Sequence, residues 1–262
     1  MNILDKIIAN KKIEVANAKA AVPVAELVKS SLYTRPTFSL KKFLLDETKT
    51  GIIAEFKRRS PSKGVINDTA DVTIVTTAYT THGASCLSVL TDENFFGGAA
   101  DDLKKARINN IPILRKDFMI DEYQITEARA MGADVILLIA ACLTPARVAE
   151  LAAFAKNLQL EVLLEIHTEA ELQHICSETE IVGINNRDLK TFTVDINRSI
   201  ELSKKIPEDK IKIAESGIND VETICTLRQA GFKGFLIGEN FMKQPDPAIA
   251  FARFIEQLNA KV

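Results

Sequence analysis

From residue 51 onward, the chain alternates short apolar runs with amphipathic stretches. The apolar runs lack the alternation of polar and apolar positions, which is typical of strands buried on both faces of a parallel sheet. There are eight such runs: GIIAEF at 51, ASCLSVL at 84, IPILR at 111, DVILLI at 134, LEVLLEI at 160, IVGIN at 181, IKIAE at 211 and GFLIG at 234. The stretches after them predict helices over 68–82, 99–109, 121–131, 144–157, 168–176, 195–205, 219–230 and 245–258.

Eight successive strand and helix units predict an α/β fold, a closed (β/α)8 TIM barrel in a single domain over residues 1–262. A doubly wound open sheet fits less well, because no G-x-G-x-x-G motif follows the first strand. We expect residues 1–50, which include TFSLKKFL at 37, to form a helical extension packed on one end of the barrel.

Charge and cysteine usage narrow the class of protein. The formal net charge of −2 provides no basic footprint for nucleic acid, so the expected ligand is a small molecule. The four cysteines lie far apart with no C-x-x-C pair, which predicts neither a zinc site nor a disulfide framework. The longest apolar run, VILLIAACL from Val135, is too short to span a bilayer, and the first residues do not resemble a signal peptide. We therefore expect a cytoplasmic protein without a membrane partner.

Polar residues gather where the apolar runs end. In a barrel of this kind the active site lies at the carboxyl ends of the strands, and residues two apart share one face of a strand. A single Lys or Glu at a strand end is usually a solvated loop residue, but five strands that end alike favour a shared site. The side chains predicted to converge at one mouth are Glu55, Lys57, Lys116, Glu165, Asn185, Arg187 and Glu215.

Other polar residues near these ends are expected to have supporting roles. Glu161 lies about 13 Å down the strand from Glu165 at 3.3 Å per residue, which places it at the opposite end of the barrel. We expect Asp117 to be structural, and His167 to support the site or contact the next helix rather than to act as a catalyst. His82 and His174 fall in predicted helices and are interpreted as surface or packing residues.

A phosphate site is predicted in the last two units. AESGIND and IGENFM each place a glycine, Gly217 and Gly238, between a strand and a helix, where barrel enzymes commonly hold phosphate on backbone N–H groups. One such glycine serves equally well in a tight turn. Both together, with Ser60 and Lys63 in the first loop, favour a phosphorylated ligand.

Taken in order, these motifs resemble the indole-3-glycerol-phosphate synthase family. The resemblance covers nearly the whole chain through IAEFKRRSPSKG, SVLTDENFFGG, PILRKDF, DVILLIAACL, LLEIH, GINNRDL, AESGI and FLIGENFM. It implies a lyase of tryptophan biosynthesis that converts 1-(2-carboxyphenylamino)-1-deoxyribulose 5-phosphate to indole-3-glycerol phosphate, with loss of carbon dioxide and water. No cofactor and no metal ion is implied, and we expect a monomer.

The resemblance also implies roles for individual residues. Lys116 would be the general acid of ring closure, and Glu165 its partner in dehydration. Lys57 would contact the substrate carboxylate or assist proton transfer. Glu55 would hold the lysines and the sugar or share the role of base, and the remaining sugar contacts are assigned to Asn185, Arg187 and Glu215.

Substrate binding is assigned in the same way. Phe96, Phe118 and Leu137 match positions that enclose the aromatic ring, although ordinary apolar packing explains them almost as well. Ser60, Gly217 and Gly238 match the phosphate site, which Ser216 and Glu239 adjoin.

Two positions depart from the family pattern. Glu239 stands where a Ser is common, and its charge would repel a phosphate unless the side chain turns away. Ala99 also stands where a Ser is frequent.

Three other functions remain open at this point. A phosphosugar isomerase on the same barrel would bind phosphate but release no carbon dioxide. A Schiff-base aldolase would form a covalent adduct on Lys57 or Lys116. A metabolite-binding barrel without activity would lose no turnover on substitution of Lys116.

Overall fold

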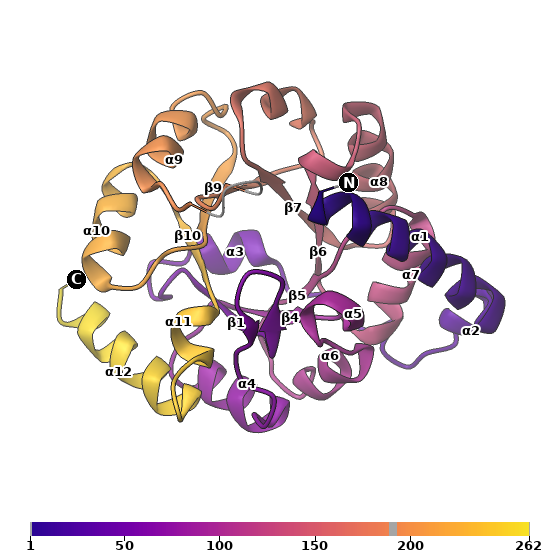
Figure 1. Cartoon of the computed structure of the whole chain (residues 1–262), viewed down its shortest axis with the longest axis horizontal. Helices are drawn as coiled ribbons and strands as arrows, with labels where there is room; N and C mark the ends of the chain where they lie inside the picture. The colour runs from indigo at the N-terminus through magenta and orange to yellow at the C-terminus, as the bar shows by residue number, and fades with distance from the viewer. Residues whose placement is uncertain (1, 189–192, 262) are drawn as a thin grey trace.

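The computed structural model describes residues 2–188 and 193–261. Its centre is a closed barrel of parallel strands in the order β1-β10-β9-β8-β7-β6-β5-β4 (Figure 1). The strands are β1 (Ile52–Phe56), β4 (Cys86–Leu90), β5 (Ile113–Lys116), β6 (Val135–Ile139), β7 (Glu161–Ile166), β8 (Ile181–Asn185), β9 (Ile211–Glu215) and β10 (Gly234–Ile237). Each predicted apolar run forms one of these strands, and the predicted (β/α)8 barrel is confirmed.

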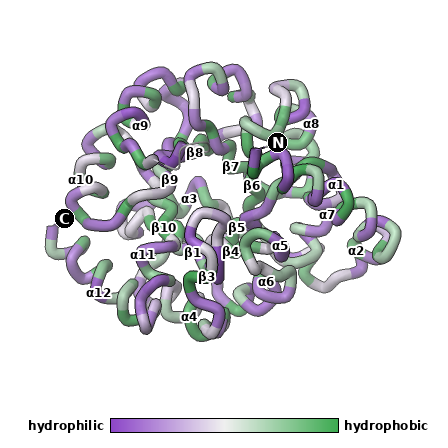
Figure 2. The backbone as a smooth tube through the Cα atoms, in the orientation of Figure 1, coloured by the Kyte–Doolittle hydropathy of each residue, from purple (hydrophilic) through white to green (hydrophobic). Residues whose placement is uncertain are grey.

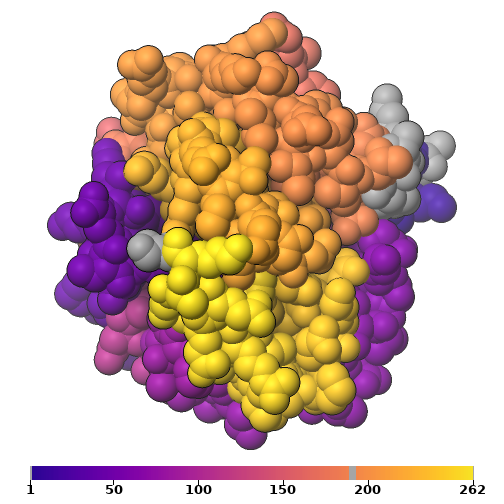
Figure 3. All heavy atoms as spheres, turned by 90° about the vertical axis from the view of Figure 1, so that its left-hand side faces the viewer, coloured from indigo at the N-terminus to yellow at the C-terminus, as the bar shows by residue number. Residues whose placement is uncertain are grey.

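A ring of helices surrounds the strands. The long members are α4 (Val72–Thr81), α6 (Ala100–Ala106), α7 (Glu122–Met131), α8 (Pro145–Asn157), α9 (Ile196–Ser203), α10 (Val221–Gln229) and α12 (Pro247–Asn259). The stretch predicted as a helix over 168–176 forms a short 3-10 helix, η2 (Glu169–His174), rather than an α-helix. Figure 3 shows the side of the barrel that α10 and the C-terminal α12 cover.

Short elements that the sequence did not predict occupy several loops. They are the hairpin β2 (Arg59–Ser60) and β3 (Gly64–Val65), together with α5 (Glu93–Phe96), η1 (Ala140–Cys142) and α11 (Glu239–Met242). All of them follow the carboxyl end of a barrel strand. They therefore shape the mouth of the barrel.

The apolar core has two parts because each strand is buried on both faces. Ile53, Leu114, Leu163 and Ile213 belong to a cluster enclosed by the strands. A larger cluster lies between the strands and the outer helices. In Figure 2, apolar residues run along much of the barrel strands, whereas the surrounding helices mix apolar and hydrophilic residues. The barrel interior is thus packed, and space for a ligand is confined to its mouth.

The N-terminal segment forms α1 (Ile3–Ala21), α2 (Val24–Leu27) and α3 (Leu40–Leu45). Leu40 and Leu44 of α3 close the amino end of the barrel, where they join the enclosed cluster. The carboxylate of Glu161, at the start of β7, accepts a hydrogen bond from the Lys41 backbone N–H at 3.0 Å. Glu161 therefore lies at the end of the barrel opposite the carboxyl ends of the strands, as predicted.

The first helix, α1, lies elsewhere than the sequence suggested. In Figure 1 it lies in front of the barrel, whereas α3 lies behind the strands. Its residues Ile3, Leu4 and Ile7 line the cavity at the mouth. The expectation that residues 1–50 pack on one end was therefore wrong, because the segment reaches both ends. No helix within the described ranges is long and apolar enough to cross a membrane.

Candidate active site

A cavity of about 470 Å³ opens among the carboxyl ends of the strands. Nearly all of the residues that were predicted from the sequence to form the site line this cavity. Its lining includes Glu55, Lys57, Ser60, Phe96, Lys116, Phe118, Glu165, Asn185, Arg187, Glu215, Ser216, Gly217, Gly238 and Glu239. The side chains that the parity argument placed at one mouth thus face one shared space, and the residues assigned from the glycine motifs and the family resemblance also line it, apart from Leu137.

Leu137 is the exception, and its prediction as a wall of the aromatic site is corrected. Its side chain is almost fully buried in the cluster enclosed by the strands, and it does not line the cavity. Ile139, two residues further along β6, has the same parity and does line the cavity. The prediction chose the correct face of β6 but the wrong depth in the barrel, because Leu137 lies about 7 Å further from the mouth than Ile139 at 3.3 Å per residue.

Sequence reasoning missed other lining residues. Ile3, Leu4 and Ile7 come from α1, and Asn240 and Lys243 lie in or just after α11. The signal for the first group is the spacing of Ile3, Leu4, Ile7 and Ile8, which places them on one apolar stripe of a helix. That stripe predicts a buried helix face but does not identify what the face covers.

Lys116 and Glu165 form the centre of the polar cluster. The Lys116 Nζ atom lies 3.4 Å from Glu165 Oε2. The other oxygen, Glu165 Oε1, is 3.2 Å from His167 Nε2 and accepts a hydrogen bond from Asn185 Nδ2 at 3.1 Å. His167 also lies 3.7 Å from the Glu171 carboxylate on η2. His167 therefore supports Glu165 and contacts the next helix, as expected.

These contacts fix the charge states of the pair. Burial alone would raise the pKa of Glu165, but Lys116, His167 and Asn185 outweigh burial and hold that pKa well below its usual range. Burial likewise would lower the pKa of Lys116, but Glu165, Glu215 and Glu55 raise it above the ordinary lysine value. At neutral pH the site holds a lysine cation beside an ionised carboxylate.

Lys57 and Glu55 form a second pair on β1 and its loop. The Lys57 Nζ atom lies 2.6 Å from Glu55 Oε1. Glu55 also packs closely against Gly238, because a Cβ atom on Gly238 would lie 2.5 Å from Glu55 Oε1. Gly238 is therefore required for this close approach, whatever it contributes to phosphate binding.

Glu215 differs from the other carboxylates. Its side chain is buried, and the Oε1 atom has no hydrogen-bond partner among the described residues. A Cβ atom on Gly183 would lie 2.2 Å from this oxygen. Burial and the neighbouring charge of Glu165 raise the pKa of Glu215 well above its usual range. The site therefore contains one carboxylate kept ionised, which can accept a proton, and one carboxyl kept protonated, which can donate a hydrogen bond.

The turn after β9 is held in an uncommon conformation. Ser216 has a φ of +68° and Gly217 a φ of +71°, so a residue with a Cβ atom occupies the left-handed region. The Asn186 side chain donates a hydrogen bond to the Ser216 carbonyl at 2.7 Å and stabilises this turn. Such conformations concentrate at binding and catalytic sites.

The sequence matches one protein family over nearly its whole length. The family model described as "Indole-3-glycerol phosphate synthase" matches residues 4–254. A protein of that name from Bacteroides thetaiotaomicron is 47% identical over 98% of this chain and 99% of its own length. Another from Polaromonas sp. is 46% identical over 96% and 97%. The chain belongs to the indole-3-glycerol phosphate synthase family.

Solved structures similar to this chain share its fold. A tryptophan synthase complex from Pyrococcus furiosus matches with a TM-score of 0.60 and 14% identity, over 81% of this chain and 98% of that one. The 3-hexulose-6-phosphate synthase from Salmonella typhimurium matches with a TM-score of 0.63 and 11% identity, over 81% and 100%. At these identities the likeness concerns the barrel alone.

Glu239, which adjoins the predicted phosphate site, lies between two cations of other loops. Its carboxylate oxygens lie 3.7 Å from Lys63 Nζ and 3.6 Å from Arg187 Nη2. The side chain therefore faces the cations at the mouth and does not turn away from them. Among the described residues, no group of three or more His, Cys, Asp or Glu side chains is arranged to hold a metal ion.

Proposed function

We propose that the protein catalyses the reaction of its family through the residues gathered in the cavity. The substrate would be 1-(2-carboxyphenylamino)-1-deoxyribulose 5-phosphate and the product indole-3-glycerol phosphate. The observation that best supports this is the meeting, in one cavity, of the Lys116 cation, the ionised Glu165 and the protonated Glu215. A reaction that needs both acid and base at neutral pH requires such a set.

Lys116 acts in ring closure. The aromatic carbon that bears the carboxylate attacks the ketose carbonyl carbon, and the carbonyl oxygen takes a proton from the Lys116 ammonium group. The oxygen that develops is more basic than an amine, so a lysine with a raised pKa still transfers its proton to it. Before that transfer, the cation stabilises the growing negative charge.

Loss of carbon dioxide then restores the aromatic ring. The electron pair of the broken carbon–carbon bond returns to the ring, and no external electron acceptor is needed. Water leaves in the last step, when Glu165 accepts a proton from the carbon next to nitrogen and Lys57 protonates the departing hydroxyl. The site takes up one proton overall, which balances the negative charge of the carboxylate lost as carbon dioxide.

The other residues of the cavity bind the substrate. Phe96 and Phe118 flank the aromatic end, and their ring centroids lie 6.0 Å apart. Ser60, Gly217 and Gly238 hold the phosphate at the opposite side of the mouth. Protonated Glu215 donates a hydrogen bond to a sugar hydroxyl, which an ionised carboxylate cannot do.

Turnover without additives tests this function. The purified protein is mixed with the substrate, without cofactor or metal, and indole fluorescence is followed together with carbon dioxide release. Both signals should rise with equal yields, and Lys116→Ala should slow both by about 10² or more. Aldose–ketose conversion without carbon dioxide, or a borohydride-trapped adduct on Lys57 or Lys116, would favour a different reaction.

We further propose that the protein acts as a monomer in the cytoplasm, where amino-acid biosynthesis takes place. A single chain contributes every residue assigned above. Light scattering on the active protein would test the monomer, since an obligate dimer would contradict it.

A further inference from the structure

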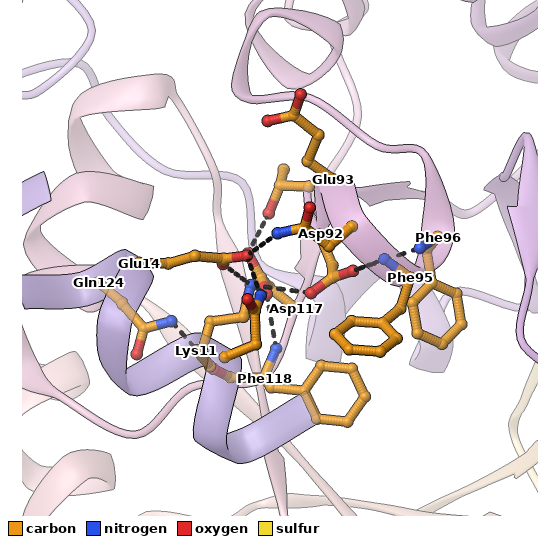
Figure 4. A network of polar contacts seen from close by, with 12 residues as sticks. Lys11, Glu14, Asp92, Glu93, Phe95, Phe96, Asp117, Phe118 and Gln124 are labelled. Carbon is orange, nitrogen blue, oxygen red and sulfur yellow. Dashed lines mark hydrogen bonds and ion pairs between the residues drawn. The ribbon is translucent and has the colours of Figure 1, made fainter. Parts of the chain in front are cut away.

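A buried lysine in α1 lies outside the reaction described above. The side chain of Lys11 is only 3% exposed, and its Nζ atom lies 2.9 Å from Asp92 Oδ2 and 2.9 Å from Asp117 Oδ1. Glu14, one turn further along α1, approaches the same atom to 2.5 Å. Figure 4 shows Lys11 reaching from its helix to the two aspartates, which belong to different loops at the mouth.

Asp92 holds the helix that carries Phe96. Its Oδ1 atom accepts hydrogen bonds from the backbone N–H groups of Phe95 at 2.8 Å and Phe96 at 3.2 Å, so it caps α5. Its Oδ2 atom has no hydrogen-bond partner among the described residues, and the ion pair with Lys11 compensates its charge. Asp92 itself is completely buried.

Asp117 holds Phe118 in the same way. Its Oδ1 atom, which contacts Lys11, also accepts the Phe118 backbone N–H at 2.8 Å. Its Oδ2 atom accepts the Thr91 hydroxyl at 2.6 Å and lies 3.2 Å from Arg115 Nη2. The expectation that Asp117 is structural agrees with these contacts, which also connect it to the loop of Asp92.

Lys11 thus joins three apolar parts of the cavity wall. Phe96 follows β4, Phe118 follows β5, and Ile7 lies one turn before Lys11 on α1; all three line the cavity. We propose that Lys11 is a positioning residue that, through Asp92 and Asp117, holds this wall closed around the aromatic end of the substrate. The proposal rests on the proposed function, from which the aromatic substrate is taken.

A gain in folding stability does not by itself explain why the Lys11 ammonium group is buried. Burial would lower the pKa of Lys11, but Asp117 and Asp92 outweigh it, so the amine stays charged. Apolar residues of similar volume often replace buried ion pairs with no loss of stability, so such a cluster contributes geometry more than net free energy. Here the geometry is that of two loops and one helix at the mouth.

The affinities for two ligands distinguish a role of Lys11 in positioning the aromatic wall from a general loss of structure at the mouth. The first probe is the substrate reduced at its ketone, which cannot react and carries the fluorescent carboxyphenylamino group; the protein has no tryptophan to interfere. The second is ribulose 5-phosphate, which has the sugar phosphate but no aromatic ring, and which is measured by displacement of the first. In Lys11→Met we expect the dissociation constant of the aromatic probe to rise at least tenfold and that of ribulose 5-phosphate to rise less than twofold.

Lys19→Met is the matched control. Lys19 lies on the same helix and pairs with Asp121 in the same loop at 2.7 Å, but its side chain is 47% exposed. This variant should bind both ligands like the wild type. Equal weakening of both ligands in Lys11→Met, or no weakening, would overturn the proposal.

A third variant covers the case in which Lys11→Met does not fold. The triple substitution Lys11→Met, Asp92→Asn and Asp117→Asn removes the two buried carboxylates together with the cation between them and keeps the oxygens that accept the Phe N–H groups. Arg115 retains Glu127 at 2.7 Å, and Glu14, which loses Lys11, is 31% exposed to solvent. We expect it to fold and still bind the aromatic probe at least tenfold more weakly than the wild type. Wild-type affinity in this variant would show that Lys11 only neutralises charge. If the wild type binds the probe but does not turn over the substrate, the proposed function fails while these binding results still decide the role of Lys11.

Discussion

Gly183→Ala tests whether the position of Glu215 matters for the reaction. Gly183 lies in β8, and a Cβ atom there would lie 2.2 Å from Glu215 Oε1 and 3.1 Å from Leu163 Cδ1. Glu215 Oε1 would have to move by about 1 Å to reach an ordinary contact, and a misplacement of about 1 Å costs roughly 10²-fold in rate. We expect kcat/KM to fall by about that factor, because the carboxyl can no longer meet the substrate hydroxyl.

The assay is steady-state formation of the indole product, with thermal unfolding measured in parallel. Gly234→Ala is the control, since its Cβ would meet Ile213 Cγ1 at 2.8 Å in the packed interior, far from the mouth. Overpacking there should cost about 1–3 kcal/mol of stability and leave kcat/KM near the wild-type value. A Gly183→Ala variant with kcat/KM within threefold of the wild type would refute the reasoning, as would an equal loss of activity in Gly234→Ala.

Three further predictions concern charge. Lys116→Ala and Glu165→Gln should each lower kcat by about 10² or more with smaller changes in substrate binding, and near-normal turnover in either variant would contradict its assigned role. Burial would lower the pKa of His167, but Glu165 and Glu171 raise it to about 9. The charged imidazole therefore stabilises the fold fully below about pH 6.5, and this stabilisation is lost as pH rises through 9. The melting temperature of the wild type should fall over this pH range, and that of His167→Asn should fall less. Asp134→Ala should cost about 3–5 kcal/mol in urea unfolding, because it leaves the buried Arg107 without the carboxylate 2.6 Å away; a loss below 1 kcal/mol would contradict this.

The sequence predicted the strands and most of the polar site because both depend on local rules. An apolar run and the parity of residues along it place Glu55, Lys57 and Glu165 on one face without knowledge of the rest of the molecule. Depth within the barrel does not follow from parity. It depends on how neighbouring strands are staggered. Leu137, which was assigned from the family resemblance, has the parity of Ile139 but lies too deep to line the cavity.

The contribution of α1 depended on contacts distant in the chain. The pairing of Lys11 with Asp92 and Asp117 joins residues about eighty and more than a hundred positions apart, and no local pattern in α1 indicates its partners. The side-chain direction of Glu239 was likewise beyond sequence reasoning, because the cations that attract it come from other loops. Charge states at the mouth required the distances themselves, since burial and neighbouring charges act in opposite directions.

The position of α3 has a consequence for synthesis of the chain. Leu40 and Leu44 are made early, yet the backbone of Gly234 that Leu44 approaches is made almost two hundred residues later. At 5–20 residues per second, a ribosome needs roughly 10–40 s to cover that interval. During this time the apolar side of α3 lacks its final partners, and the amino end of the barrel cannot be sealed before β10 has emerged.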